Sequence, residues 1–204
     1  EAVIKDIGVD TIKTGMLYSD EIVSTVAELV KNNNLLAVVD PVIIAKDGAA
    51  LFKQQAIEAV RNQLLPGTYL LTPNIPEAEA LTGKPIKTLE DMEEAAKELQ
   101  TMGARHVLIK GGHRDGDAIG GLLAGAAMQR LAAERIDPVN THGTGCSYSA
   151  ALATFLAQGQ PLAKAATSAK LFINEAIRHA APLGGGHGPI NHFAVAKAVQ
   201  DALR

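Results

Sequence analysis

The sequence contains a single cysteine among its 204 residues, which excludes an internal disulfide and fits a reducing cytoplasm. No apolar run approaches the roughly 20 residues of a membrane-spanning helix, and the N-terminus has no signal-peptide pattern. The formal net charge of −3 leaves no basic footprint for nucleic acid and no polybasic stretch for a membrane surface. We therefore expect a cytoplasmic protein that binds neither nucleic acid nor a membrane.

Short apolar runs alternate with longer segments of helical periodicity, which is typical of βα units and a mostly parallel sheet. With 47% hydrophobic residues, the chain can bury the core of one α/β domain over residues 1–204. Runs rich in Val, Ile and Leu, as in strands covered on both faces, predict strands at 9–14, 35–39, 69–71 and 106–110.

Polar residues in capping positions mark the starts of two predicted helices. Ser19 or Asp20 caps the first, and Thr88 caps the second with Asp91 three residues further on, while Gly103 ends it. The predicted buried residues are Ile22, Val26, Leu29 and Val30 in the first helix and Met92, Ala95, Ala96 and Leu99 in the second.

The remaining segments are predicted from periodicity and breaker residues alone. Further helices are expected over 51–64, 144–158, 162–181 and 193–203, the last of them capped by Asn191. Between residues 116 and 140, Leu122-Leu123 and 128–136 predict an antiparallel hairpin or a flap.

Polar side chains follow three of the predicted strands at the point where each strand ends. Asp40 follows the second strand, Asn74 and Glu77 the third, and Lys110 ends the fourth. If the strands are parallel neighbours, these groups meet at one edge of the sheet and suit Mg²⁺ with a polyphosphate. Singly, each residue also fits a turn, a helix start or a solvated strand end.

The segment from Asn140 to Ser147, NTHGTGCS, precedes a predicted helix of small residues. Gly143 and Gly145 let the backbone approach a ligand closely, and free amides at a helix start bind anions. Cys146 in that position can take a proton as a thiolate, although a lone cysteine can also pack as a small apolar residue. No H-x₃-H or C-x₂-C spacing supports a zinc site in this sequence.

With these motifs in hand, the chain resembles the ribokinase-like superfamily, and within it the hydroxymethylpyrimidine/phosphomethylpyrimidine kinases of thiamine biosynthesis. The resemblance is carried in order by IKTGML (12–17), VVDPVIIAKDG (38–48), LTPNIPEAEALTG (71–83), VLIKGGH (107–113), NTHGTGCSYSAALA (140–153) and HGPINHF (187–193). It implies a three-layer α/β fold whose central, mostly parallel sheet has helices on both faces. It also implies that the family's first βα units, roughly sixty residues, lie upstream of this chain.

The resemblance implies a role for each of the singled-out residues. Cys146 is the catalytic base that activates the hydroxymethyl group, and Gly143, Thr144 and Gly145 form the anion hole. On the nucleotide side, Asn74 and Glu77 organise Mg²⁺ partly through water, with Asp40 and Lys110 near the metal and the ATP phosphates. Gly15 and Met16 are expected to border the substrate.

The implied enzyme phosphorylates 4-amino-5-hydroxymethyl-2-methylpyrimidine and then its monophosphate with MgATP, and it is a homodimer. Two alternatives stay open at this point. Relatives that share the Gly-Thr-Gly-Cys loop phosphorylate pyridoxal, so pyridoxal kinase is a rival within the same class. The chain could also be a nucleotide-binding remnant without activity, because it runs almost at once into the apolar stretch VDTIKTGML (9–17) and the expected upstream units are missing from it.

Overall fold

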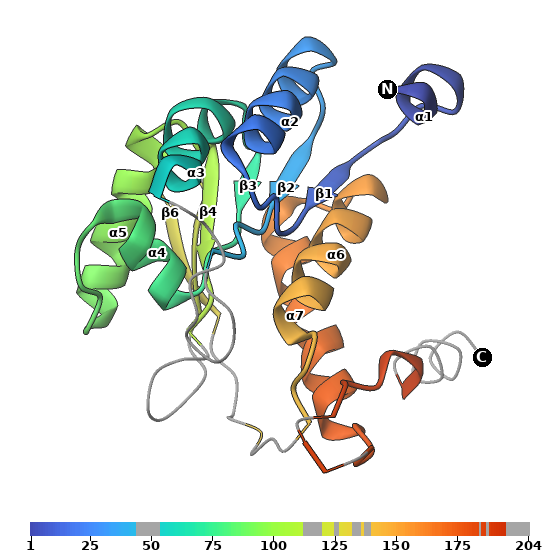
Figure 1. Cartoon of the computed structure of the whole chain (residues 1–204). Helices are drawn as coiled ribbons and strands as arrows, with labels where there is room; N and C mark the ends of the chain where they lie inside the picture. The colour runs from blue at the N-terminus through green and yellow to red at the C-terminus, as the bar shows by residue number, and fades with distance from the viewer. Residues whose placement is uncertain are drawn as a thin grey trace. The chain divides into compact units, whose positions relative to one another are not determined.

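Within the residues that the structure describes, six strands form one sheet in the order β1-β2-β3-β4-β5-β6 (Figure 1). The strands are Ile12–Thr14 (β1), Ala37–Val39 (β2), Leu70–Leu71 (β3), His106–Ile109 (β4), Gly120–Ala124 (β5) and Ala127–Leu131 (β6). The first four are parallel, and β4, β5 and β6 are antiparallel. All four strands predicted as parallel are therefore confirmed, although β1 begins at Ile12 rather than at Val9.

This computed structural model describes residues 1–43, 54–111, 120–124, 127–131, 136, 140–183, 185–186 and 188–194. The chain divides into two compact units, Glu1–Ala133 and Glu134–Arg204. The sheet belongs to the first unit, and the longest helices follow in the second. A single domain over residues 1–204 stays a prediction.

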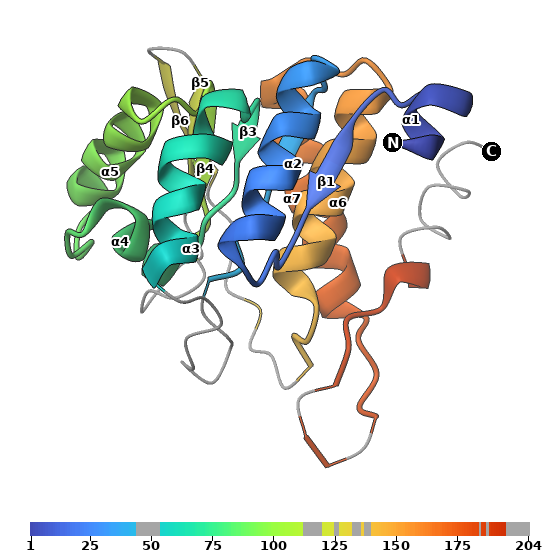
Figure 2. The same ribbon diagram turned by 45° about the horizontal axis from the view of Figure 1, so that its top comes forward.

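The later helices of the first unit cover one face of the sheet and share one apolar core with it, whereas the short helix at the N-terminus has no buried residue (Figure 2). The helical segments are Ala2–Asp6 (α1), Asp20–Asn32 (α2), Gln54–Ala59 (α3), Ile75–Thr82 (α4) and Leu89–Thr101 (α5). Val39 and Leu71 belong to this core, whereas Val38 and Leu70 point to the opposite face and are 0% exposed. Burial on both sides explains why these strands are almost continuously apolar.

The predicted buried face of α2 is confirmed at Val30 and wrong at Ile22, and Val26 packs against the core as a partly buried side chain. Ser19 caps α2 as expected, because its side chain accepts a hydrogen bond from the Ile22 amide. The buried side chains are Val23, Ala27 and Val30, and Ile22 is 46% exposed. Val23 and Ile22 are adjacent and both apolar, so periodicity alone could not decide which of them faces the core.

The predicted helix over 51–64 is confirmed from Gln54, and residues 51–53 lie outside the described part. After α3, a π-helical turn, Val60–Leu64, and a 3₁₀ turn, Leu65–Gly67, carry the chain past Pro66, where the sequence predicted an end. Pro66 is tolerated because it occupies the first turn of the 3₁₀ segment, where its missing amide is not needed.

Both predictions for α5 are confirmed. Thr88 and Asp91 form a reciprocal capping box, since each side chain accepts a hydrogen bond from the other residue's backbone amide. Gly103 follows the helix with a φ of 119°. The buried residues of α5 are Met92, Ala95, Ala96 and Leu99, as the periodicity predicts.

A hairpin of β5 and β6 extends the parallel part of the sheet, which confirms the antiparallel hairpin predicted in this region. Gly121 pairs with Ile109 on one side and with Arg130 on the other. Met128 packs against the main core as a partly buried side chain. The hairpin thus adds sheet beyond β4, on the side away from β1.

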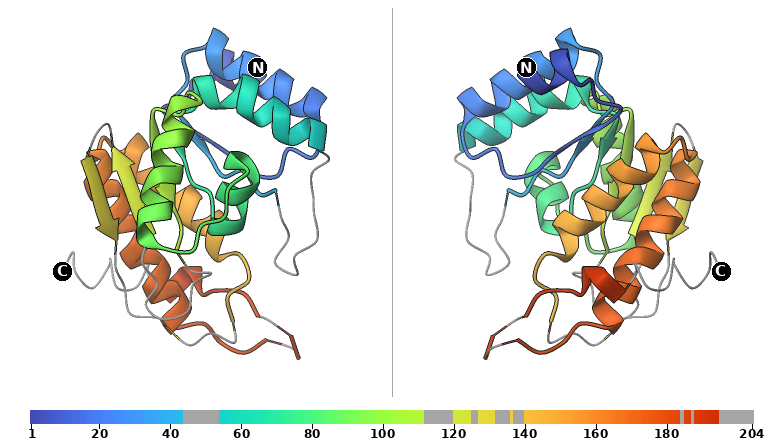
Figure 3. Two further views of the ribbon diagram at one scale, coloured as in Figure 1. Left: turned by 90° about the vertical axis from the view of Figure 1, so that its left-hand side faces the viewer. Right: turned by 90° about the vertical axis from the view of Figure 1, so that its right-hand side faces the viewer.

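Two long helices, Thr144–Ala157 (α6) and Leu162–Arg178 (α7), lie side by side in the second unit (Figures 1 and 3). The α6 helix has the predicted length, and α7 ends at Arg178, three residues before the predicted end. Asn191 caps the next helix as predicted, because its Oδ1 accepts hydrogen bonds from the amides of Phe193 and Ala194. The rest of that predicted helix lies outside the described residues.

No helix in the part of the chain that the structure describes is both long enough and apolar enough to span a membrane.

Candidate active site

Four of the predicted site residues meet at the carboxyl edge of the parallel sheet. Asp40 follows β2, and its amide donates to the Thr14 carbonyl at the end of β1, over 3.2 Å. Lys110 follows β4 and forms a parallel bridge with Asn74, and its amide donates to the Pro73 carbonyl over 2.8 Å. Parallel register therefore brings residues from three separate strand ends to one edge, as the sequence predicts.

Lys110 and Asp40 form a buried ion pair in this cluster. The Lys110 Nζ lies 2.7 Å from the Asp40 Oδ1, and the two side chains are 15% and 2% exposed. Such a pair stays charged only because each partner compensates the other's loss of hydration. The alternative in which Lys110 is a solvated strand end is therefore wrong.

Asn74 and Glu77 form the capping box of α4. The Asn74 Oδ1 accepts from the Glu77 amide, and the Glu77 Oε2 accepts from the Asn74 amide, both over 2.8 Å. The N-x-x-E spacing thus has a helix-capping role, which the sequence left open as one explanation for Glu77. Since each group uses only part of its oxygen lone pairs in the cap, the remaining ones can serve a ligand.

The Glu77 carboxyl is electrostatically unusual because it is only 2% exposed. Burial raises the pKa of this carboxyl above its ordinary value, and the Asp40 carboxylate acts in the same direction. Lys110 and the backbone hydrogen bonds from Asn74 and Ile43 lower the pKa and only partly offset that rise. An additional cation near Glu77 would favour its charged form.

The raised pKa of Glu77 predicts a pH-dependent effect of the Glu77→Gln substitution. In the unfolded chain this carboxyl ionises near pH 4.5, whereas in the folded protein it ionises at a higher pH. The contribution of the Glu77 carboxyl to stability is therefore lost as pH rises above 4.5. Glutamine does not ionise, and its side-chain oxygen can still accept the Asn74 amide. The free energy of unfolding of Glu77→Gln, measured by urea titration, should therefore increase relative to that of the wild type as pH rises. A difference that stays constant between pH 4 and pH 7 would contradict this electrostatic account.

Two further features of this edge are of a kind that is common at binding sites. The hydroxyl of Thr14 at the end of β1 is buried and has no hydrogen-bond partner among the described residues. Val42, two residues after Asp40, has a φ of 39°, which is costly for a β-branched residue. Orphaned polar atoms and backbone strain cluster at functional sites, where a ligand or a constraint from the fold accounts for them.

Magnesium is compatible with these groups. Proteins usually hold Mg²⁺ through one or two carboxylates together with water and substrate phosphates, rather than in an all-protein cage. Asp40 and Glu77 supply carboxylate oxygens, and Asn74 supplies an amide oxygen. Within the described residues, no group of three or more His, Cys, Asp or Glu side chains is arranged to hold a metal. The cluster therefore fits a metal that is bound together with a polyphosphate.

The glycine-rich loop begins α6 in the second unit. Gly143 is the N-cap with a φ of 86°, a left-handed conformation that glycine adopts without the Cβ penalty. The Thr144 hydroxyl donates to the Thr141 carbonyl over 2.8 Å, which ties the first helical turn to the preceding loop. The Thr144 amide donates to the Thr141 carbonyl over 3.3 Å. Gly145 and the exposed Cys146 follow in that turn, where the amides of a helix start have no partner within the helix. The loop thus has the geometry of an anion site with a thiol beside it.

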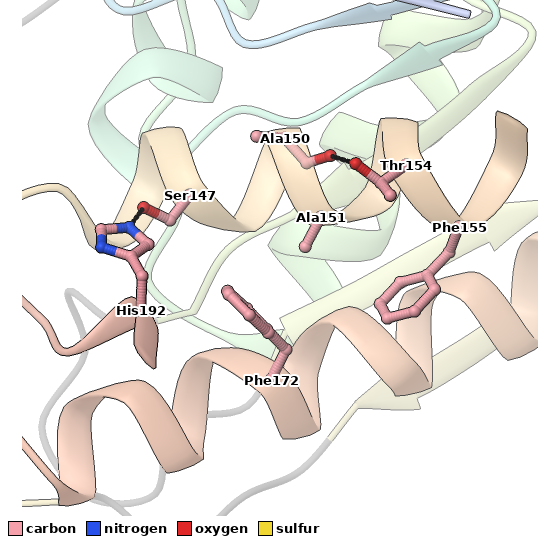
Figure 4. Close-up of a pocket in the computed structure, with 7 residues that line it drawn as sticks. All are labelled: Ser147, Ala150, Ala151, Thr154, Phe155, Phe172 and His192. Carbon is pink, nitrogen blue, oxygen red and sulfur yellow. Dashed lines mark hydrogen bonds between the residues drawn. The ribbon is translucent and has the colours of Figure 1, made fainter. Parts of the chain in front are cut away.

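Sequence reasoning assigned no role to His192, which contacts this helix. Its Nε2 lies 2.7 Å from the Ser147 Oγ, one residue after Cys146 (Figure 4). The two residues border a cavity of about 260 Å³ between α6 and α7, whose other lining residues are Ala150, Ala151, Thr154, Phe155 and Phe172. His192 lies within the HGPINHF motif, so the motif itself was the signal that could have drawn attention to it.

The expected site thus falls into two parts. The four strand-end residues come together in the first unit, while Gly143, Thr144, Gly145 and Cys146 lie in the second. Gly15 follows β1 at the same sheet edge as the strand-end cluster, and the adjacent Met16 is 53% exposed. That the two parts form one catalytic centre stays a prediction from the family resemblance.

The α/β fold, the charged cluster at the strand ends and the glycine-rich helix start define a ribokinase-like small-molecule kinase. The chain belongs to the phosphomethylpyrimidine kinase family, whose sequence profile matches residues 1–191. The resemblance inferred from the motifs is thereby confirmed.

Individual relatives agree with this assignment. The chain is 40% identical to a hydroxymethylpyrimidine/phosphomethylpyrimidine kinase of Bacillus subtilis, over 95% of this chain and 73% of that protein. It is 51% identical to a thiamine biosynthesis bifunctional protein, ThiED, of Geobacter sulfurreducens, over 98% of this chain but only 41% of that protein. The chain therefore spans less than half of the bifunctional relative and about three quarters of the shorter one.

Solved structures with the same fold include two kinds of vitamin kinase. An ADP complex of Bacillus subtilis pyridoxal kinase has a TM-score of 0.88 and 38% identity, covering 96% of this chain and 75% of that one. A phosphomethylpyrimidine kinase of Clostridium difficile has a TM-score of 0.77 and 38% identity, covering 86% and 72% respectively. The ribokinase-like fold is confirmed, and the fold alone does not separate the two substrates.

Proposed function

We propose that the protein containing this chain is an ATP-dependent kinase that phosphorylates 4-amino-5-hydroxymethyl-2-methylpyrimidine and then its monophosphate. The observation that carries the proposal is membership in the phosphomethylpyrimidine kinase family over residues 1–191. The nucleotide-side cluster and the Gly-Thr-Gly-Cys loop are both present in the chain, which supports an active enzyme rather than a remnant.

We propose that Cys146 acts as the base. Its thiolate takes the proton of the substrate hydroxyl, whose oxygen forms a bond to the γ-phosphorus of ATP while the bond to the β,γ-bridging oxygen breaks and ADP leaves. Gly143, Thr144 and Gly145 place backbone amides where the transferred phosphoryl group gains negative charge. The same residues would serve the second transfer, in which a phosphate oxygen of the monophosphate attacks.

On the other side of the proposed centre, the strand-end cluster would hold the nucleotide. Asn74 and Glu77 would bind Mg²⁺ partly through water, and Asp40 and Lys110 would lie close to the metal and the phosphates. The buried ion pair of 2.7 Å supports this assignment, because it keeps the Lys110 ammonium in a fixed place before ligand arrives. When bound, Mg²⁺ would neutralise charge on the phosphate oxygens. Gly15 and Met16 would border the alcohol, and we expect a cytoplasmic homodimer.

Pyridoxal kinase is the second candidate, and two structural neighbours favour it. One is the Bacillus subtilis pyridoxal kinase described above, and the other is a Staphylococcus aureus pyridoxal kinase in complex with AMP-PCP and pyridoxal, with a TM-score of 0.84 and 34% identity. Against this candidate, the family profile and the curated relatives are those of pyrimidine kinases.

Measuring kcat/KM for each alcohol with the full-length protein and saturating MgATP separates these candidates. We expect the hydroxymethylpyrimidine to be preferred over pyridoxal by about 10-fold or more, since one well-placed polar contact gives discrimination of that order. A higher kcat/KM for pyridoxal would overturn the first choice. Absence of turnover with both alcohols would support the remnant hypothesis.

A further inference from the structure

A short segment near the end of the described chain lies alongside the THGTGC loop. Pro189 forms a parallel bridge with His142, directly before Gly143. The His142 amide donates to the Gly188 carbonyl over 3.0 Å, and the Ile190 amide donates back to the His142 carbonyl over 3.3 Å. Residues 188–192, called the strap here, thus hold the loop through both backbone groups of His142.

The other end of the strap is anchored to the end of α7. The Asn191 amide donates to the Ala176 carbonyl over 2.9 Å, and its side-chain amide donates to the His179 carbonyl over 3.1 Å. His192 then contacts Ser147 at the start of α6, as Figure 4 shows. The strap therefore connects the catalytic loop to the rigid body of the helix pair.

One side chain reinforces this connection from the loop side. Asn140 is 9% exposed, and its Oδ1 accepts a hydrogen bond from the Gly188 amide over 3.0 Å. This bond joins residues 48 positions apart in the sequence. Because Asn140 and Gly188 are far apart in the sequence, this buried hydrogen bond fixes the distance between two segments of the chain rather than the local conformation of either segment.

Gly188 is required at this contact for a steric reason. A Cβ on Gly188 would lie 2.4 Å from the Asn140 Oδ1 and 3.0 Å from its Cγ, which is closer than side chains tolerate. The third neighbour, the Leu183 amide nitrogen, is 3.4 Å away and would make an ordinary contact. The shortest contacts of that Cβ are therefore with the Asn140 side chain, and removing this side chain should relieve the clash.

We propose that Asn140 and Gly188 are positioning residues that fix the Gly143–Cys146 loop in the geometry for phosphoryl transfer. The proposal rests on the function proposed above, because it assumes that this loop carries the chemistry. Asn140 precedes Gly143 by three residues, so a shift at Asn140 is transmitted directly to the anion hole. Displacements of about 1 Å in such a site cost roughly 10²-fold in rate.

A double-mutant cycle on the full-length protein tests this inference. We expect Asn140→Ala to lower kcat about 10-fold and Gly188→Ala to lower it about 10²-fold, with KM for ATP and for the alcohol changing less than about threefold. The double variant should return to the level of Asn140→Ala, because the clash disappears with the side chain. Gly185→Ala is the matched control, since a Cβ there meets no atom of the described residues within 4 Å.

A second readout does not depend on turnover. Cys146 is the only cysteine of this chain and is exposed, so its rate of alkylation by iodoacetamide, followed on its own peptide by mass spectrometry, reports on the loop. We expect Asn140→Ala and Gly188→Ala to change that rate by about threefold or more and Gly185→Ala to leave it unchanged. If the variants change the alkylation rate but the wild type turns over neither alcohol, the role of the strap in positioning the loop is retained and the proposed function is refuted.

The inference is overturned if both single variants keep kcat and the alkylation rate within about twofold of the wild type. It is also overturned if the double variant is no better than Gly188→Ala, because the glycine would then be needed for another reason. Should Gly188→Ala fail to fold, a folded and active double variant would support the proposed contact, and an unfolded one would refute it.

Discussion

Replacing Cys146 with alanine is expected to lower kcat by about 10²-fold or more, the usual scale for removing a general base. MgATP binding should change little, because the loop amides and the strand-end cluster are intact in the variant. The exposed position of Cys146 means that the substitution leaves no core cavity, so the thermal midpoint should stay near that of the wild type. Rapid-quench kinetics and calorimetric titration with a non-hydrolysable ATP analogue would measure the two effects separately.

Two further substitutions at the same position separate a base from a packing residue. Cys146→Asp should recover part of the lost rate, because a carboxylate at the helix start can also accept a proton. Cys146→Ser preserves size and polarity but supplies only a weak base, so it should behave like alanine. Near-wild-type activity in Cys146→Ala would mean that the cysteine is structural.

Replacing Lys110 with methionine is expected to have the largest effect on stability. The substitution leaves the Asp40 carboxylate, with its side chain 2% exposed, without the Lys110 ammonium at 2.7 Å. Removing one partner of a buried ion pair costs about 3–5 kcal/mol, because the charge that remains in the interior loses an opposite charge. Urea unfolding at neutral pH would measure this loss, and the double variant Asp40→Asn/Lys110→Met should recover most of it.

The chain offers a matched control for this experiment. Lys84 and Glu98 also form an ion pair of 2.7 Å, but their side chains are 58% and 26% exposed. Because solvent screens an exposed pair, Lys84→Met should destabilise the protein far less than Lys110→Met does. Equal losses in Lys84→Met and Lys110→Met would show that the strand-end pair gains nothing from its burial.

Much of the fold could be predicted because its signals are local. Strands β2 and β3 are continuous apolar runs, and the caps at Ser19, Thr88 and Asn191 each involve residues two to three positions apart in the sequence. The meeting of Asp40 and Lys110 was also predictable, because parallel strands bring their carboxyl ends to one edge. Position along a strand is enough for such an inference.

Other features depend on contacts that leave no local pattern. Ile22 and Val23 are neighbours of similar character, and only the packed core shows that Val23 is the buried one. The contact between Asn140 and Gly188 spans 48 positions and follows no periodicity. His192 was visible as part of a motif, but its hydrogen bond to Ser147 requires the chain that follows α7 to return to the first turn of α6. These are tertiary choices, and sequence spacing does not encode them directly.

The Asn74 and Glu77 pair shows a third situation, in which one spacing supports two roles. Their reciprocal hydrogen bonds of 2.8 Å make a capping box that would stabilise α4 in any protein. The raised pKa of the buried Glu77 carboxyl is an electrostatic cost that a pure cap does not require. A structural and a metal-binding role are therefore compatible at this position, and the cap preorganises the oxygens for the proposed ion.

The most direct test of the whole account is a ³¹P NMR time course of MgATP and hydroxymethylpyrimidine with the full-length protein, run in parallel with Cys146→Ala. The account predicts that the wild type forms the monophosphate and then the diphosphate while ADP accumulates, and that Cys146→Ala forms neither at a comparable rate. It would be contradicted if the wild type produced no phosphorylated pyrimidine, or if Cys146→Ala produced it as fast as the wild type.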